Sequence, residues 1–448
     1  MLKQIPVYSS LFIALSAVCA FLFLSVTGVN SSSLPTHETI GISEIEHRAF
    51  EYFWNESDPA TGLTRDRASN FGRETNAVAS IAATGYALSA IPIGVSHKWV
   101  SRQAAYSRTL TTLRFIDKTL PNTHGWYYHF VDIHTGARVW NCEISSIDTG
   151  LLLMGVIVAG QSFPGTDAAA LARRIVDRTD FRWMQTRGST MPDGEFLSMG
   201  WKPESGWLPN DWSGWNESPF LYILAMGSPN HSISADAWSK LSFRAAKVEG
   251  YAVIGGPTPL FMAQMGAGLI DFRNMRDSHG VDLWVNSVNA HRANHAYCVH
   301  NTTKFKTYAA GLWGVSANDL PPPAGYGAQS DTDGNNDGTV SPSAAITSIL
   351  FTPDIGQSTL QLLATQHKTQ IWGKYGFSDA LNVDKNWYDR DVIGIDLGMM
   401  LVALEDYRTG LIWHLCRQST VLGTGLRKAG FRVTHEQQPR SLVRSGKG

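Results

Sequence analysis

Residues 143–160 of the chain read EISSIDTGLLLMGVIVAG. The stretch opens with two carboxylates, Glu143 and Asp148, and then runs from Leu151 to Gly160 without a polar side chain. A helix that is apolar on all sides has to be enclosed by other elements. The stretch therefore predicts a buried helix that carries carboxylates at its first turn.

The same pattern recurs twice: Glu217 begins the apolar stretch 217–227, and Asp396 lies at the start of 394–405. Apolar residues recur on one face only in the segments that alternate with these stretches, at 101–115, 167–179, 234–248, 357–368 and 411–429. A ring of inner helices wrapped by outer helices requires this alternation. We therefore expect an all-α fold of the (α/α) barrel kind, in which parallel inner helices gather their carboxylates at one rim.

Ser43 and Glu46 form a possible capping box that would begin the first helix, before Phe50 and Phe53 at helical spacing. From this point we divide the chain of 448 residues into four parts. They are a signal peptide (1–28), a polar leader (29–41), one catalytic domain (42–430) and a flexible basic tail (431–448).

Secretion is expected because Lys3 precedes the apolar run 11–26, although an uncleaved signal anchor is the alternative reading of that run. Asn-x-Ser/Thr acceptors, which N-glycosylation requires, begin at Asn30, Asn55, Asn216, Asn230 and Asn301. Pro219 disfavours modification at Asn216. Three of the four cysteines follow the signal peptide, so at most one intramolecular disulfide can form.

Composition points to a neutral partner. The formal net charge is −1 and the pI is about 6.9, which argues against binding to nucleic acid, or to an anionic membrane after signal cleavage. Trp, Tyr and Phe make up 11% of the chain, and many lie in polar, Gly-rich stretches. Such rings suit the faces of sugars, although each could equally belong to the core. We expect a monomer that binds an oligosaccharide or polysaccharide.

Hydrolysis of a glycosidic bond needs one protonated carboxyl group and one carboxylate. Glu217 is the candidate acid, because Trp212, Trp215 and Phe220 would desolvate it and raise its pKa. Asp396 is the candidate base, with glycines on both sides that leave room for water or substrate. The alternative is that these carboxylates only cap helix N-termini.

Other polar and aromatic loop residues are candidates for contacts with sugar. Arg and Asp side chains in loops could grip hydroxyl groups or form internal ion pairs instead. The predicted substrate-binding residues are Glu143, Asp148, Arg65, Asp66, Trp140, Trp215, Arg276, Asp277, Trp387 and Tyr388.

One loop resembles a calcium site, with oxygen ligands at alternate positions: Asp331, Asp333, Asn335 and Asp337. The Glu that should end such a loop is replaced by Pro342, so a turn-rich surface loop is the preferred interpretation. His124, His129 and His134 do not share a helical face, and no metal or other cofactor is assigned.

Seven segments, taken in order, resemble the glycoamylase-like glycoside hydrolases, a group that includes bacterial and fungal endo-β-1,2-glucanases. They are residues 53–56, 61–67, 79–85, 143–149, 199–203, 270–273 and 407–413. The resemblance implies an (α/α)6 barrel, a six-hairpin toroid, and inverting hydrolysis of β-1,2-glucan to sophoro-oligosaccharides.

The resemblance also matches the family's general acid to Glu217 and its general base to Asp396. In the fungal branch, which secretion and glycan acceptors favour, the base is thought to act on water through a substrate hydroxyl. Bacterial members typically have Tyr-Asn-Glu where this chain has Trp215-Asn216-Glu217. The expected function is a secreted endo-β-1,2-glucanase. The alternatives are a hydrolase of another linkage on the same fold and a glycan-binding protein without catalysis.

Overall fold

A computed structural model describes residues 40–186 and 194–434. The predicted signal peptide, nearly all of the leader, and the tail from residue 435 lie outside these residues, as do Asn30 and Cys19. Within the described ranges, no helix is both long and apolar enough to cross a membrane.

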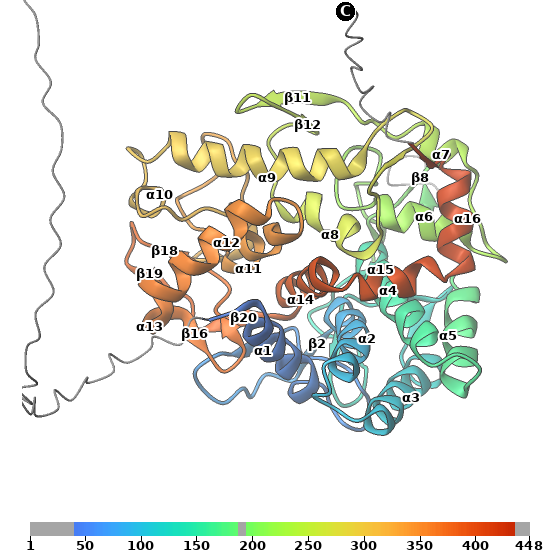
Figure 1. Cartoon of the computed structure of the whole chain (residues 1–448). Helices are drawn as coiled ribbons and strands as arrows, with labels where there is room; N and C mark the ends of the chain where they lie inside the picture. Colours follow the sequence, from blue (N-terminus) through green and yellow to red (C-terminus); the bar gives the residue numbers. More distant parts are fainter. Residues whose placement is uncertain (1–39, 187–193, 435–448) are drawn as a thin grey trace, which may run out of the picture. The chain divides into compact units, whose positions relative to one another are not determined.

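Six helices are buried along most of their length, and the three predicted apolar stretches are among them, as α4, α6 and α14. The six are α2 (Ile81–Ser96), α4 (Ser146–Ser162), α6 (Pro219–Gly227), α8 (Phe261–Leu269), α11 (Pro342–Thr347) and α14 (Gly394–Arg408). Packing runs from α2 to α4, α4 to α6, α6 to α8, α8 to α14, and from α14 to both α11 and α2. Figure 1 shows α14 among these helices.

A second set of helices packs on the outside of the first. The longer members are α1 (Ile42–Asn55), α3 (Arg102–Lys118), α5 (Asp167–Asp177), α9 (Leu283–His300), α12 (Pro353–Leu362), α15 (Leu411–Arg417) and α16 (Thr420–Lys428). α1 contacts α2 and α14, α5 contacts α4, α9 contacts α8, and α16 contacts α6. The fold is therefore predominantly helical, with buried and half-exposed helices as the sequence predicts.

Two details of the predicted helices are wrong. The expected helix at 234–248 shrinks to α7 (Asp236–Ser239), and β11 (Ala245–Val248) and β12 (Tyr251–Ile254) form a hairpin after it. Glu249 and Gly250 both adopt positive φ and turn the chain there. The capping box also fails, because Gly41 occupies the N-cap of α1 and makes no side-chain cap.

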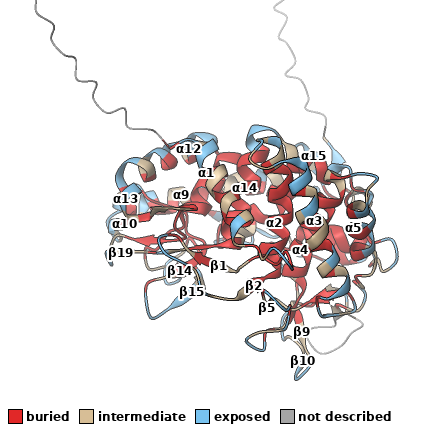
Figure 2. Ribbon diagram, turned by 90° about the horizontal axis from the view of Figure 1, so that it is seen from below, coloured by how far each residue is buried: buried red, intermediate tan, exposed pale blue. Residues whose placement is uncertain are grey.

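Short antiparallel strands join the helices. β1 (Arg67–Ser69) pairs with β20 (Asp391–Ile393), β2 (Val78–Ser80) with β5 (Phe130–Asp132), and β14 (Ala317–Leu320) with β15 (Gly325–Ala328). β6 (Ile144–Ser145) joins β9 (Gly200–Lys202) and β10 (Gly206–Trp207). β2, β6 and β20 lead directly into α2, α4 and α14. Figure 2 shows β1, β2, β14 and β15 along one end of the helices.

The remaining short elements complete the connections. They are α10 (Lys306–Ala309), α13 (Lys368–Ile371), a 3₁₀ turn (Ser348–Leu350), a π turn (Leu363–His367), β3 (Asn122–Thr123), β4 (Trp126–Tyr127), β7 (Gln185–Thr186), β8 (Phe196–Leu197), β13 (Met275–Arg276), β16 (Trp372–Gly373), β17 (Gly376–Phe377), β18 (Leu381–Asn382), β19 (Trp387–Tyr388) and β21 (Arg432–Val433).

α2 and α4 approach each other through glycines. A Cβ atom on Gly155 would lie 2.0 Å from the carbonyl oxygen of Gly85, and one on Gly85 would lie 2.4 Å from the carbonyl oxygen of Leu151. No side chain fits at either place, because real Cβ contacts are not this short. These glycines therefore permit the close contact between two inner helices.

The buried apolar side chains form one contiguous cluster across these helices. Cys142, Cys298 and Cys416 are buried and unbonded, so the described residues contain no disulfide. The core therefore holds this part of the chain together without covalent cross-links.

Candidate active site

A cavity of ≈ 740 Å³ opens where the short strands meet the starts of the inner helices. Asp148 reaches it from the first turn of α4, Glu217 from the residues just before α6, and Asp396 from the first turn of α14. The carboxylates that the sequence places at the starts of three enclosed helices therefore line one cavity. Asp66 and Trp140, also predicted site residues, line it too.

Glu217 is held at the cavity wall by a turn that precedes α6. Asn216 Oδ1 accepts the N–H of Ser218 at 2.8 Å, and Pro219 begins the helix. Glu217 is 9% exposed, and its buried Oε2 has no hydrogen-bond partner among the described residues. Burial raises the pKa of Glu217 to about 7, and the negative charge of Asp148 adds to the shift. The side chain can therefore hold a proton at near-neutral pH.

Asp396 lies among other acids. It is 4% exposed, and Ile393 and Ile395 beside it also line the cavity. Burial raises the pKa of Asp396, a hydrogen bond from Asp379 opposes that rise, and the charge of Asp66 adds to it. The net effect raises the pKa of Asp396 to about 8, so Asp396, like Glu217, is a buried carboxyl group whose protonated form is favoured.

Arg67 offsets part of this negative charge. Its Nη1 donates to Asp319 Oδ2 at 2.7 Å and lies 3.9 Å from Asp391 Oδ2, and its Nε lies 3.6 Å from Asp66 Oδ2. The pairing of β1 with β20 brings Arg67 opposite Ile393, three residues before Asp396. The guanidinium group of Arg67 therefore lies within 4 Å of three carboxylates near the candidate base.

His129 links two predicted carboxylates. Its Nδ1 lies 2.9 Å from Glu143 Oε1, and its Nε2 lies 3.5 Å from Asp148 Oδ2. Ser145 Oγ donates to Asp148 Oδ2 at 2.5 Å. Burial lowers the pKa of His129, but the charges of Asp148 and Glu143 outweigh burial and raise it. The imidazole lines the cavity, whereas Glu143, a predicted substrate-binding residue, is not among the residues that line it.

Aromatic rings form part of the cavity wall. Trp140 is 64% exposed, has a positive φ of 56°, and packs edge-on against Phe130 with ring centroids 5.1 Å apart. Phe130 stacks on His129. Tyr326, which is 48% exposed, reaches the cavity from the β14–β15 hairpin. The sequence singled out Trp140 but missed Phe130, His129 and Tyr326.

Two predicted site residues, Arg65 and Trp215, contact other parts of the protein. Arg65 Nε donates to Glu56 Oε2 at 3.0 Å, so its guanidinium group pairs with the residue after α1. Trp215 packs against Gly255 and Phe243, with ring centroids of the two aromatics 6.1 Å apart. Neither is among the residues that line the cavity.

Four other predicted residues are also used elsewhere. Asp277 accepts the indole N–H of Trp238 at 3.0 Å, and Arg276 donates to the carbonyl oxygen of Gly280 at 2.9 Å, so both stabilise a turn. Trp387 and Tyr388 form β19, opposite β18. These residues lie outside the cavity lining.

The suspected calcium loop is held by lysines. Asp333 Oδ1 accepts a hydrogen bond from Lys304 Nζ at 2.7 Å, and Asp337 Oδ2 accepts one from Lys385 Nζ at 2.5 Å. Asp331 is buried, which raises its pKa to about 6. The lysines thus supply the positive charge that two of these carboxylates need.

Two other groups in the described ranges have the spacing of metal ligands. One is Glu46, His97 and Glu405, and the other is Asp319, Asp379 and Asp389. Arg408 already pairs with Glu46 in the first group. Arg67 pairs with Asp319 in the second group. In each group, therefore, an arginine of the chain already pairs with one of the carboxylates.

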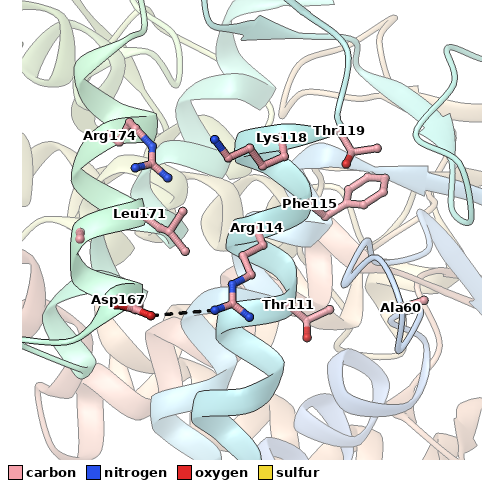
Figure 3. A pocket seen from close by; sticks show the side chains of 10 residues that line it. Ala60, Thr111, Arg114, Phe115, Lys118, Thr119, Asp167, Leu171 and Arg174 are labelled. Atoms are coloured by element: carbon pink, nitrogen blue, oxygen red, sulfur yellow. Dashed lines mark ion pairs between the residues drawn. The ribbon is translucent and has the colours of Figure 1, made fainter.

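A second hollow, of ≈ 640 Å³, lies between α3 and α5 on the outside of the helices (Figure 3). Arg114 Nη2 lies 3.9 Å from Asp167 Oδ2 across the hollow. Lys118 and Arg174 also line it. Most of its charged side chains are well exposed, so their interactions are screened by water. The buried carboxylates lie in the first cavity, which is the candidate active site.

Comparison with known families and proteins supports a relation to glycoside hydrolases. The Glycoamylase family model, described as "Putative glucoamylase", matches residues 209–420, a range that includes Glu217 and Asp396. A curated protein from Parabacteroides distasonis, an exo β-1,2-glucooligosaccharide sophorohydrolase (non-reducing end), is 26% identical over 437 residues. That match covers 89% of this chain but only 59% of the relative's length.

Solved structures resemble the fold over most of its length. The endo-β-1,2-glucanase from Chitinophaga pinensis, in complex with sophorotriose and glucose, has a TM-score of 0.80 and 27% identity, covering 88% of this chain and 99% of that one. The endo-β-1,2-glucanase from Talaromyces funiculosus with sophorose has a TM-score of 0.64 and 12% identity, covering 89% and 94%, and shows likeness of fold alone. The expected resemblance to glycoamylase-like hydrolases is confirmed. The chain is 27% identical to this bacterial enzyme and 12% identical to the fungal one. These identities favour the bacterial branch, whereas the predicted secretion signal and glycan acceptors favoured the fungal branch.

Proposed function

We propose that this chain is an endo-β-1,2-glucanase that hydrolyses its substrate with inversion at the anomeric carbon. One observation carries the proposal: Glu217 and Asp396, which are distant in sequence, are both buried carboxyl groups that line the same cavity. Hydrolysis of a glycosidic bond with inversion requires such a pair of carboxyl groups in one site.

The proposed fold is a closed (α/α)6 barrel. The six buried helices would form the inner ring, and the half-exposed helices would form the outer one. Contacts run from α2 through α4, α6 and α8 to α14 and back to α2, and α11 packs on α14; these contacts support the arrangement. The same helices carry the carboxylates at their N-terminal ends, so the barrel rim would be the catalytic face.

In the proposed reaction, Glu217 donates its proton to the leaving glycosidic oxygen as the C1–O bond breaks. A water molecule attacks C1 from the opposite face, and its proton passes to Asp396 through a hydroxyl group of the substrate. The buried, unpartnered Oε2 of Glu217 supports its role as the acid, since burial keeps the proton on this side chain near neutral pH.

The lining supports a sugar substrate. Trp140 and Tyr326 offer exposed rings for glucose faces, and Asp66, His129 and Asp148 offer polar atoms for hydroxyl groups. The likeness to the Chitinophaga endo-β-1,2-glucanase, at 27% identity, supports endo action.

We further propose that the protein is secreted as a monomer after removal of residues 1–28, and that it works without a metal or other cofactor. Of the candidate glycan acceptors, Asn55 and Asn230 are exposed. Asn216 is 8% exposed beside Glu217 and inaccessible to a glycan. A digest of the secreted protein by an N-glycosidase would therefore locate glycans at Asn55 or Asn230 but not at Asn216.

The test is incubation of the purified protein with linear β-1,2-glucan, β-1,3-glucan, β-1,4-glucan and starch, with Glu217→Gln as the inactive control. We expect sophoro-oligosaccharides of several lengths from β-1,2-glucan alone, first released as the α-anomer in proton NMR. Sophorose as the sole early product would indicate exo action instead. Cleavage of another glucan would replace the proposed linkage, and binding without cleavage would indicate a glycan-binding protein.

A further inference from the structure

Asp319, Asp379 and Asp389 bring three buried carboxylates to one place outside the cavity lining, and we refer to them as the aspartate cluster. Asp319 lies in β14, Asp379 follows β17, and Asp389 follows β19. The three residues are 7%, 3% and 8% exposed, respectively. One carboxylate oxygen from each lies within 4.8 Å of the other two, so three separate segments of the chain meet at these oxygens.

Backbone hydrogen bonds hold the three segments of the cluster together. Asp379 Oδ2 accepts the N–H of Asp319 at 2.8 Å, and the N–H of Asp389 donates to the carbonyl oxygen of Ala380 at 3.0 Å. Asp389 Oδ1 accepts the N–H of Arg390 at 2.7 Å. The backbone therefore fixes the positions from which the carboxylates converge.

Two oxygens of the cluster are buried and have no hydrogen-bond partner among the described residues. They are Asp379 Oδ1 and Asp389 Oδ2. In the same part of the chain, Asp319 alone among the three has an ion-pair partner, Arg67 Nη1 at 2.7 Å. A buried charge without a partner is costly, because it loses its hydration and gains nothing in return. A cation between the carboxylates would supply the missing positive charge.

The other acidic groups have more basic partners. Arg408 pairs with Glu46 in the first group that has the spacing of metal ligands. His97 Nε2 lies 2.7 Å from Glu405 Oε2 in that group. Lysines pair with two aspartates of the loop at 331–337. In the aspartate cluster, by contrast, one arginine faces three buried carboxylates.

The donor atoms of the cluster indicate which kind of ion would fit. Carboxylate oxygens suit hard cations such as Ca²⁺ and Mg²⁺. Ca²⁺ lies about 2.3–2.6 Å from its ligands, so two ligands of one ion are at most about 5 Å apart, and the spacing of the cluster meets this limit. Mg²⁺ usually keeps several water molecules, which buried side chains accommodate poorly. Calcium is therefore the better fit.

We propose that Asp319, Asp379 and Asp389 bind a calcium ion that fixes β14 to the segments that follow β17 and β19. The ion takes no part in bond cleavage, since its ligands lie outside the cavity lining, and the proposed hydrolysis still uses no metal. It stabilises the β14–β15 hairpin, which carries Tyr326, and the start of β20, which leads into α14. The site does not depend on the proposed reaction.

Protons are the alternative source of positive charge for the metal-free chain. Burial raises the pKa of Asp389 to about 7, and burial followed by the charges of Asp396 and Asp389 raises the pKa of Asp379. A metal ion binds the ionised carboxylates and displaces such protons. Binding is therefore best measured at about pH 8, where protons compete less.

Calcium titration of the chelator-treated protein tests the site without any measurement of activity. At about pH 8 we expect about 5 mM calcium chloride to raise the Tm by about 3 °C or more, relative to sodium chloride of equal ionic strength, because the ion binds only the folded state. Isothermal titration calorimetry should detect the same binding. An unchanged Tm without heat of binding would overturn the proposal in favour of protons. A response to magnesium chloride alone would refute the assignment to calcium.

Two variants test the ligands. Asp389→Asn keeps an oxygen for the N–H of Arg390, and Asp379→Asn keeps one for the N–H of Asp319. Without calcium, we expect the Tm of each variant to equal or exceed that of the parent, since one unpaired buried charge is gone. With calcium, the Tm of each should rise by less than about 1 °C, because a ligand is weakened. A parent-like rise in either variant would contradict the proposed site.

Asp331→Asn and Asp406→Asn are the matched controls. Asp331 is the buried aspartate of the suspected calcium loop, and its Oδ1 also has no partner among the described residues. Asp406 is a buried aspartate of α14 whose Oδ1 accepts the N–H groups of Ile412 and Trp413. Both variants should keep the parent's response to calcium. Loss of the response in Asp331→Asn would place the ion in the loop, and loss in Asp406→Asn would show that the effect is not specific to the cluster; either result would refute the proposal.

Discussion

Glu217 is unusual for a side chain just before a helix, because its carboxyl group is buried and its Oε2 has no hydrogen-bond partner in the described structure. A surface carboxylate at that position would favour its ionised form through the helix dipole. Here burial outweighs that effect and raises the pKa to about 7. Burial of this carboxyl group therefore destabilises the fold, but it also keeps Glu217 protonated for the proposed reaction.

Replacement of Glu217 by Gln should remove the proton donor while keeping the shape of the side chain. We expect kcat on β-1,2-glucan to fall by about 10²–10⁴-fold with the Tm within a few degrees of the parent. Glu204→Gln is the control, since Glu204 is an exposed partner of Arg138 in the β9–β10 turn. Near-normal turnover in Glu217→Gln would remove this residue from the mechanism.

The pH profile should report the same group. Because Glu217 must be protonated and burial sets its pKa at about 7, kcat/KM should decline above pH ~7, by about tenfold per unit once the group is mostly ionised. Initial rates from pH 4 to pH 9 would measure this limb. A rate that stays flat to pH 9 would show that another group donates the proton.

Trp140 should contribute to binding more than to folding, because 64% of it is exposed and its main ring contact is Phe130. Trp140→Ala is expected to raise KM about three- to tenfold, with little change in Tm, since it removes one face for sugar stacking. Tyr407→Ala, at an exposed position near the end of α14, should leave KM unchanged. An unchanged KM in the Trp140 variant would place the substrate elsewhere.

Residues that stand in a regular pattern could be predicted from the sequence, and those placed by long-range pairing could not. Asp148, Glu217 and Asp396 each precede or begin an apolar helix, so their common location follows from parallel inner helices. Tyr326 lies in the β14–β15 hairpin, which contains no such pattern, and only the folded chain brings it to the cavity.

At the scale of elements, the contact of α2 with α4 depends on Gly85 and Gly155 more than on apolar side chains. A Cβ on Gly155 would meet the carbonyl oxygen of Gly85 at 2.0 Å, so the two helices would have to separate. We expect Gly155→Ala to destabilise the fold by about 1–3 kcal/mol or more, measured by urea unfolding.

Gly266→Ala in α8 is the matched control. Nothing lies within 4 Å of a Cβ built there, and Ala is favoured over Gly within a helix by about 1 kcal/mol. This variant should be neutral or slightly more stable than the parent. If both glycine variants behaved alike, close approach of the helices would not be what requires Gly155.

Helix periodicity predicted the main elements, because a helix buried on one face has apolar residues at helical spacing and a helix buried on all faces has a continuous apolar run. It failed at 234–248, where the turn at Glu249 and Gly250 commits the segment to a hairpin. It also failed at Ser43, since Glu46 is fully buried and pairs with Arg408 instead of closing a capping box. A local hairpin decided the first case, and a partner far along the chain decided the second.

At the scale of the whole molecule, several buried acids favour the protonated state. Burial raises the pKa of Glu46, Glu217 and Asp389 to about 7 and that of Asp331 to about 6. An acid with a raised pKa stabilises the fold below its unfolded pKa of about 4, and that contribution is lost as pH rises through the folded value. These groups therefore weaken the fold between about pH 4 and pH 7.

Other acids act in the opposite direction. Burial resists ionisation of Asp337, but hydrogen bonds from Lys385 and Thr339 outweigh it and lower the pKa to about 2, so the stability that Asp337 provides is lost only in strong acid. We expect the highest Tm between about pH 4 and pH 6 and a decline toward pH 8, measured by differential scanning calorimetry. A Tm that rises from pH 6 to pH 8 would contradict the raised pKa values.

The three unbonded thiols of the described structure have a practical consequence. Cys142, Cys298 and Cys416 are buried, and burial raises the pKa of each, so they should react slowly with maleimides. A cysteine introduced on the exposed tip of the β14–β15 hairpin would then be labelled selectively in the folded protein. A fluorophore attached there would report the arrival of a glucan chain beside Tyr326 without removal of any native cysteine.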